Sequence, residues 1–194
     1  WIMSSELKVD TISEKTSAAG VTIDGLLIKD GAVPSITQNP AFSEVDMWVI
    51  NTDLTSDHEP IGSTYFTRHT GTLINMPIGS GMAVASDGAW TFPSTGFYEV
   101  QFIANVENDT NSNATEIFID ATDDNFSSVD RIAYARFYGN DNSRTTYIAT
   151  AIVDITNTTN DKVRFDFNEV NTSTLRGNAN EFRSGVIFKK IAST

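Results

Sequence analysis

The strongest constraint on the fold is the segment Phe97 to Val106, in which apolar and polar side chains alternate. Successive side chains of a strand point to opposite faces of a sheet, so this period of two predicts a strand with one buried face. The predicted core face carries Tyr98, Val100, Phe102, Ala104 and Val106. Phe97 and Ile103 interrupt the opposite, polar face, which predicts that another sheet or subunit covers part of it.

Similar runs, rich in Val, Ile, Thr, Phe and Tyr, recur along the chain between clusters of Gly, Asn, Asp, Ser and Pro. This pattern predicts an all-β, antiparallel sandwich with very little helix. The predicted strands are Met47–Asn51, Ser63–Thr67, Ala89–Phe92, Phe97–Val106, Thr115–Ala121, Arg131–Tyr138, Thr145–Ile155, Lys162–Phe167 and Gly185–Ile191. In the run 162–167, a shift of one residue would bury Arg164 and Asp166, so its register is well specified.

Composition narrows the classes of partner. The 194 residues carry 25 acidic and 13 basic side chains, a formal charge of -12, which opposes binding to nucleic acid or to anionic membrane surfaces. No apolar run is long enough to insert into a membrane, and without cysteine the chain has no disulfides or thiol chemistry. Because the sequence opens with Trp1 rather than Met, we expect further residues upstream.

The first 35 residues differ from the rest. Leu26 to Ile28 place apolar side chains on both faces of one short strand, which a stretch of this size cannot cover by itself. Winding three copies around one axis would cover them, and packing on the chain's own globular domain is the alternative. We therefore predict an extended attachment and trimerisation arm at 1–35, a linker at 36–45 and a head domain at 46–194.

Two resemblances add to this interpretation. The segment Asp10 to Thr16, followed by Gly20 to Gly31, resembles a linking element of bacteriophage tail-fibre and other virion proteins. The block Asp87 to Tyr98 resembles the strand, Pro, Gly and aromatic sequence that enters a long core strand in the complement-type and tumour-necrosis-factor-type (TNF-type) jelly rolls. Ser184-Gly185 before apolar residues resembles the closing strand of that superfamily, whereas Asn160-Asp161 replaces its frequent Gly-Asp.

The resemblance to these jelly rolls implies a sandwich of eight to ten strands, assembled as a homotrimer around a threefold axis. It also implies that loops at the distal end carry recognition. Function still has to be argued from sites, because a shared fold does not establish a shared activity.

Catalytic patterns are weak. His58 and His69 form no zinc motif, and Gly79-Ser80-Gly81 lacks the spacing of a nucleophile elbow. Candidates for the two acids of a glycosidase are Asp120, Asp123, Asp124 and Asp130. The acidic loops Asn108 to Asn113 and Asp120 to Asn125 could bind calcium, although neither has the spacing of a helix-loop-helix calcium site. Acidic residues in turns are usually solvated, so we expect no enzyme activity, no metal and no cofactor.

A candidate ligand-binding surface surrounds the polar turn 139–143. Aromatic rings beside amide, carboxylate and guanidinium groups suit the hydroxyls of carbohydrates, although an ordinary hairpin tip is the alternative. The candidate residues are Tyr138, Asn140, Asp141, Asn142, Arg144 and Tyr147. Trp48 and Trp90 lie within apolar strand patterns and are expected in the core or at subunit contacts rather than as sugar platforms.

These observations lead to the expectation of a virion structural protein, a trimeric fibre or spike subunit located on the virus particle. Its arm would contact other virion proteins, and its head would bind a host-surface glycan or protein noncovalently. A capsid-decorating head fibre, a secreted bacterial adhesin or ligand of the same fold, and a polysaccharide-cleaving enzyme are the alternatives.

Overall fold

The computed structural model of the chain describes residues 21–23, 26–28, 42–71, 73–108, 114–138, 143–168 and 173–194. Contacts divide the chain into two units, Trp1–Pro40 and Ala41–Thr194. In the first unit, β1 (Val21–Ile23) and β2 (Leu26–Ile28) form an antiparallel hairpin. The rest of the predicted arm and most of the predicted linker lie outside the described residues, so their roles stay predictions.

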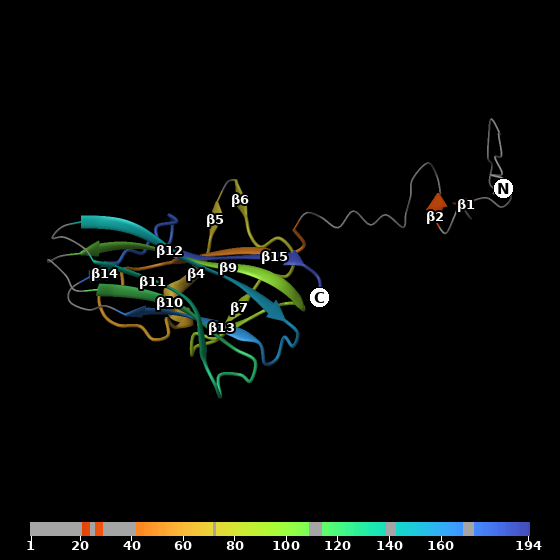
Figure 1. Cartoon of the computed structure of the whole chain (residues 1–194). Coiled ribbons are helices and arrows are strands. Elements are labelled where there is room, and N and C mark those ends of the chain that lie inside the picture. The colour runs from red at the N-terminus through yellow and green to blue at the C-terminus, as the bar shows by residue number, and fades with distance from the viewer. Residues whose placement is uncertain are drawn as a thin grey trace, which may run out of the picture. The chain divides into compact units, whose positions relative to one another are not determined.

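The second unit is a sandwich of two antiparallel sheets (Figure 1). The six-stranded sheet contains β12 (Ser143–Ile155), β9 (Gly96–Asn108), β15 (Gly185–Ala192), β3 (Val45–Ile50) and β4 (Phe66–Arg68) in that order, with β14 (Ser173–Leu175) beside β9. The five-stranded sheet contains β11 (Asp130–Tyr138), β10 (Ala114–Thr122), β13 (Lys162–Asn168), β8 (Trp90–Thr91) and β7 (Ala83–Val84). This arrangement confirms the predicted all-β antiparallel sandwich.

Two smaller elements complete the described fold. The hairpin of β5 (Thr70–Gly71) and β6 (Ile74–Asn75) follows β4. The only helical element among the described residues is a single 3-10 turn, η1 (Ser63–Tyr65). A strand was predicted from Ser63, but the N–H of Tyr65 donates to the carbonyl of Gly62 at 3.1 Å and closes the turn, so that β4 begins only at Phe66.

Strand β9 is the centre of the six-stranded sheet. It pairs with β12 over its whole length, from Gly96 opposite Ile155 to Asn108 opposite Ser143. Its buried and half-buried residues alternate strictly, and all five predicted core side chains are fully buried. The period of two in the sequence therefore predicted both the strand and its orientation.

Aromatic side chains fill the space between the sheets. The Trp90 ring is fully buried, and its centroid lies 5.0 Å from those of Phe66 and Phe188. Trp48 meets the Trp90 ring edge-on at 5.3 Å and donates its indole N–H to Asp46. Both tryptophans thus belong to the core and its edge, as predicted.

The two ends of the sandwich have different neighbours in the chain. At the proximal end, where the described head begins with Phe42, Val45 pairs with Lys189 near the C-terminus. At the distal end, β9 ends at Asn108, β12 begins at Ser143, and β14 pairs with the last residues of β9. Polar side chains stabilise this distal end, where the Ser173 hydroxyl bonds to Asn108 and Thr115 at 2.7 Å each.

Candidate functional site

The predicted ligand-binding surface lies at the distal end, and the structure describes part of it. Tyr138 is the last residue of β11, and its side chain is 70% exposed. The Arg136 guanidinium lies 5.5 Å from the centroid of the Tyr138 ring. Arg144, on the opposite sheet, donates to Glu107 at 2.7 Å. The remaining turn residues of the prediction lie outside the described residues: Asn140, Asp141 and Asn142.

Tyr147 differs from the prediction. It stands opposite Ala104, on the inward side of β12, and its side chain packs against the core. The alternation of strand side chains gives the reason, because Ala149 and Ala151 share this inward side and leave room for a large ring beside them. The aromatic residue of this surface that the structure describes as exposed is therefore Tyr138.

A chain of ion pairs holds the distal end together. Arg176 contacts Asp53 at 2.6 Å and Glu107 at 3.4 Å, and Glu107 also pairs with Arg144. Asp53 additionally accepts the backbone N–H of Gly177 at 2.8 Å. These residues are far apart in the sequence and share no motif, so sequence analysis had no signal for them.

A second candidate surface is the outer face of the six-stranded sheet. Five apolar side chains on this face form what we call the apolar strip: Phe97, Ile103, Ile148, Ile152 and Ile187. Ile103 and Ile148 are direct partners across β9 and β12, and Ile148 and Ile152 are 56% and 64% exposed. Phe97 and Ile103 were predicted to interrupt the polar face of β9. In the structure, Ile148 and Ile152 of β12 add two more apolar side chains to the same face.

The β5–β6 hairpin adds an apolar tip beside this sheet. It projects from the six-stranded sheet on the side away from the five-stranded sheet (Figure 1). Leu73, in its turn, is 97% exposed. A leucine this exposed costs free energy in water, since burying a leucine side chain is worth about 1.5–3 kcal/mol.

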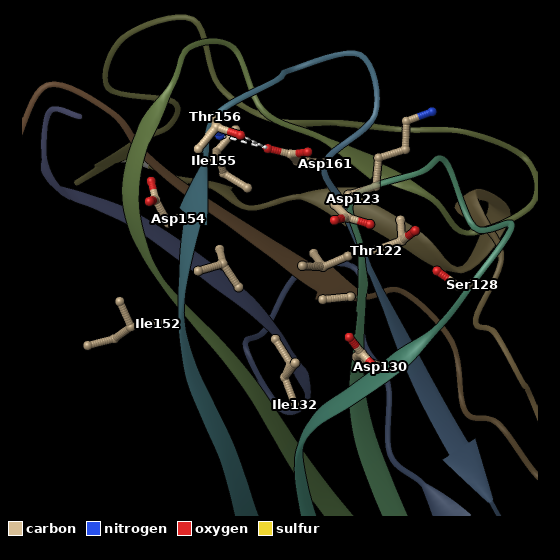
Figure 2. A pocket seen from close by; sticks show the side chains of 14 residues that line it. Thr122, Asp123, Ser128, Asp130, Ile132, Ile152, Asp154, Ile155, Thr156 and Asp161 are labelled. Carbon is tan, nitrogen blue, oxygen red and sulfur yellow. Dashed lines mark hydrogen bonds between the residues drawn. The ribbon is translucent and has the colours of Figure 1, made fainter.

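A cavity of about 400 Å³ opens at the proximal end, between the ends of β10 and β12. Figure 2 shows Asp123, Asp130 and Ile132 on one side of it and Asp154 and Ile152 on the other. The combination of isoleucine walls and carboxylates would exclude anionic ligands. Ile152 belongs to both the cavity and the apolar strip, so the two surfaces are continuous.

The four acidic residues proposed from the sequence do not form one site. Asp123 and Asp130 line the cavity, but Asp120 lies on the outer face of the five-stranded sheet, where it bonds to Arg131. The Asp124 carboxylate accepts a hydrogen bond from the backbone N–H of Ser128 in its own loop. Of the four acids, Asp123 and Asp130 therefore share one cavity, and Asp120 and Asp124 lie outside it.

Asp124 has a structural role in the β10–β11 loop. Its carboxylate accepts hydrogen bonds from the backbone N–H and the hydroxyl of Ser128 and from the hydroxyl of Thr122. These donors lower the pKa of Asp124 to about 2, with the Ser128 N–H contributing most. The carboxylate is therefore fully ionised and committed to its loop.

The acidic residues that do meet are Asp120 and Asp166. Asp120 accepts from Arg131 Nε at 2.9 Å and Nη2 at 3.3 Å, whereas Asp166 reaches Arg131 Nη2 only at 3.7 Å. Asp166 was predicted on the wet face of its strand, but it is only 6% exposed. Neighbouring strands and the segment around Glu59 cover it, which no pattern within β13 could indicate.

The remaining catalytic candidates are separated. The His58 ring packs on Tyr65 at 4.5 Å, and burial lowers the pKa of His58. The His69 ring lies against Phe182 at 6.1 Å. Among the described residues, no three side chains of His, Asp or Glu are grouped so that they could hold a metal ion. In the same part of the chain, no helix is long and apolar enough to cross a membrane.

Comparison with solved structures places this fold among TNF-type jelly rolls. The Eiger TNF structure from S. frugiperda superposes with a TM-score of 0.58 at 11% identity, over 80% of this chain and 96% of that one. Murine APRIL, in a crystal structure at pH 5.0, superposes with a TM-score of 0.54 at 7% identity, over 76% and 98%. No family model and no curated protein matches the sequence. At these identities the likeness establishes the fold, a TNF-like β-sandwich.

Proposed function

We propose that this chain is a virion structural protein, a subunit of a homotrimeric fibre or spike. Its distal end attaches noncovalently to a glycan or protein of the host surface, and its N-terminal arm contacts other virion proteins. The observation that carries the assembly is the apolar strip, exposed on a sandwich with a TNF-like fold.

The apolar strip supports self-association because exposing apolar side chains to water costs free energy. Ile148 and Ile152 expose most of their side chains on the same face as half-buried Phe97, Ile103 and Ile187. Contiguous apolar patches of this kind mark protein interfaces on soluble proteins. A closed ring of identical copies buries the same patch on each subunit and leaves none exposed.

The virion setting is supported by the N-terminal sequence. Asp10 to Gly31 resembles a linking element of phage fibre proteins, and the β1–β2 hairpin lies within it. A capsid-decorating fibre with the same arm, and a secreted adhesin or ligand, remain the alternatives. Labelling of intact particles with an antibody against the head separates these settings. A tail fibre places the label at the tail, a capsid-decorating fibre places it on the capsid, and a secreted protein leaves the particle unlabelled.

A trimer makes weak contacts sufficient for attachment. Three heads on one shaft raise the effective concentration of the second and third contacts, so that avidity exceeds single-site affinity by roughly 10²–10⁴. We also propose that the head acts without catalysis, with the cavity acids Asp123, Asp130 and Asp154 serving as solvated surface carboxylates. Release of sugar from host polysaccharide by the purified chain would contradict this part.

Attachment is tested with the fluorescently labelled chain on host cells. Tyr138→Ala removes the exposed ring at the distal end, and we expect cell binding to fall at least tenfold with the trimer intact. Val129→Ala, which also truncates an exposed apolar side chain but in the β10–β11 loop, is the matched control. Equal binding by the Tyr138 and Val129 variants would refute recognition by this surface.

A further inference from the structure

The environment of Asp166 lacks the donors that a buried carboxylate needs. Its Oδ1 is buried and has no hydrogen-bond partner, and its Oδ2 lies 3.7 Å from Arg131 Nη2, beyond hydrogen-bond distance. Asp46 shows the contrast: it is also buried, but it accepts from the Trp48 indole, the Arg68 guanidinium and the Met82 N–H. An orphaned buried carboxylate is costly, so Asp166 calls for a ligand that can satisfy it.

The charges that face Asp166 come from each element packed around it. Asp120 approaches from β10, Arg131 from β11, and Glu59 from the segment beside β13. Glu59 accepts from Asn168 at 2.7 Å, and Arg131 gives its short bonds to Asp120. Asp120 and Asp166 therefore share one guanidinium, and Glu59 adds a further negative charge nearby.

The other cations of this face contact other groups, although Arg164, directly opposite Asp120 across β10 and β13, keeps a buried Nε without a hydrogen-bond partner. The Arg164 guanidinium lies 3.6 Å from the Phe126 ring centroid and 3.6 Å from Asp87. Arg136 pairs with Glu116 at 3.2 Å, and Lys162 bonds to Asn125. His58 stands opposite Phe167 in the bridge to β13, so its side chain shares the inward side with Phe167 and lies away from Asp166.

We propose that Asp120 and Asp166 form a proton-binding site, in which one shared proton holds the β10–β13 face together and its loss at alkaline pH loosens that face. A proton fits because Arg131 donates to Asp120 but leaves Asp166 Oδ1 without a donor, and a protonated Asp166 can donate to Asp120. The described residues offer no third ligand in position for a metal ion, which leaves the proton as the smallest cation that satisfies both carboxyl groups.

The electrostatics of the site agree with this geometry. Burial, followed by the hydrogen bond and the negative charge of Asp120 and the charge of Glu59, raises the pKa of Asp166 to about 7, and Arg131 opposes the shift only in part. Because the two carboxyl groups interact strongly, the pair titrates as a unit.

The sign of the pH effect follows from the direction of this shift. The native pair binds more protons than the unfolded chain between about pH 4 and pH 7, so stability is greatest below this window and falls as the pH rises through about 7. Each unit of pKa shift corresponds to about tenfold in the unfolding equilibrium. The loss between pH 4 and pH 8 can therefore reach about a thousandfold.

The test measures unfolding of the full chain between pH 4 and pH 8. Asp166→Asn keeps the shape and removes the titration, so we expect its unfolding constant to stay nearly flat where the wild type rises at least tenfold. Asp120→Asn removes one negative charge and frees Arg131 to pair with Asp166. The rise of the unfolding constant should then occur at lower pH than in the wild type. Asp123→Asn, a matched change outside the pair, should retain the wild-type profile.

A direct measurement on the wild type covers the case in which the variants do not fold. Carboxyl carbon shifts followed by NMR should show the Asp166 carboxyl group titrating near pH 7. Titration of this group below pH 5, or an Asp166→Asn profile that keeps the wild-type slope, would overturn the proposal.

Discussion

The outer face of the six-stranded sheet carries the exposed Ile148 and Ile152 beside the Lys189–Glu99 ion pair, whereas the outer face of the five-stranded sheet carries the exposed Tyr134 beside several ion pairs and a buried acid pair. Both faces are built on strands that alternate in the same way, and both close over one aromatic core. On the first face, Ile148 and Ile152 stay exposed among the described residues. The second face satisfies most of its groups by itself, apart from Asp166 Oδ1 and Arg164 Nε. In the account proposed above, association between subunits uses the first face and pH acts on the second.

The largest effect is expected from charges placed on the apolar strip. Ile148→Arg combined with Ile152→Arg should convert the assembly to monomers, because two guanidinium groups would lose their hydration in the interface. Light scattering measures the mass, and circular dichroism checks that the fold is retained. Val129→Arg, which adds one of these two charges at an exposed apolar residue outside the strip, is the control. A trimer that survives the double substitution would show that the strip is not the interface.

The next effect concerns the charged face. Arg131→Gln removes the guanidinium that Asp120 and Asp166 share, and at pH 8 it should cost about 3 kcal/mol of unfolding free energy, the lower end for loss of one partner since Arg131 is half-exposed. The midpoint temperature of thermal unfolding at pH 8 should fall by roughly 6–12 °C. At pH 4, where the pair is protonated, the cost should be much smaller. An equal loss at both pH values would contradict the account of the acid pair.

The smallest effect sharpens the comparison at the β5–β6 hairpin. Leu73→Ser should leave the unfolding free energy of the monomeric Ile148→Arg/Ile152→Arg form within about 0.5 kcal/mol, since surface substitutions that break no contact have little effect. In the wild-type background it should weaken the trimer, if the tip packs on a neighbour. Dissociation measured by dilution in an analytical ultracentrifuge compares the two. If the dissociation of the trimer stays unchanged, Leu73 lies outside the interface.

The parts of the fold that could be predicted from the sequence depend on local alternation. Phe97 to Val106 predicted its strand, its core face and the interruption of its polar face, because all three follow from the order of side chains within one segment. The 3-10 turn at Ser63 could not be read in the same way, since its residues also suit a strand.

The sites were harder to predict because they join distant segments. The burial of Asp166 depends on β10, β11 and the segment at Glu59, and the distal ion pairs join Asp53 and Glu107 to Arg176. Tyr147 was placed at the turn by its proximity in sequence, whereas its position in the alternation turns it inward. A pattern within one strand specifies orientation, but it does not specify what another strand brings against it.

The central claim is that the apolar strip is covered by sister copies of the chain. Sedimentation equilibrium of the unmodified chain at micromolar concentration measures this directly. The account predicts a single species of three times the 21.2 kDa chain mass. A species of 21.2 kDa across the whole concentration range, with Ile148 and Ile152 left in water, would contradict it.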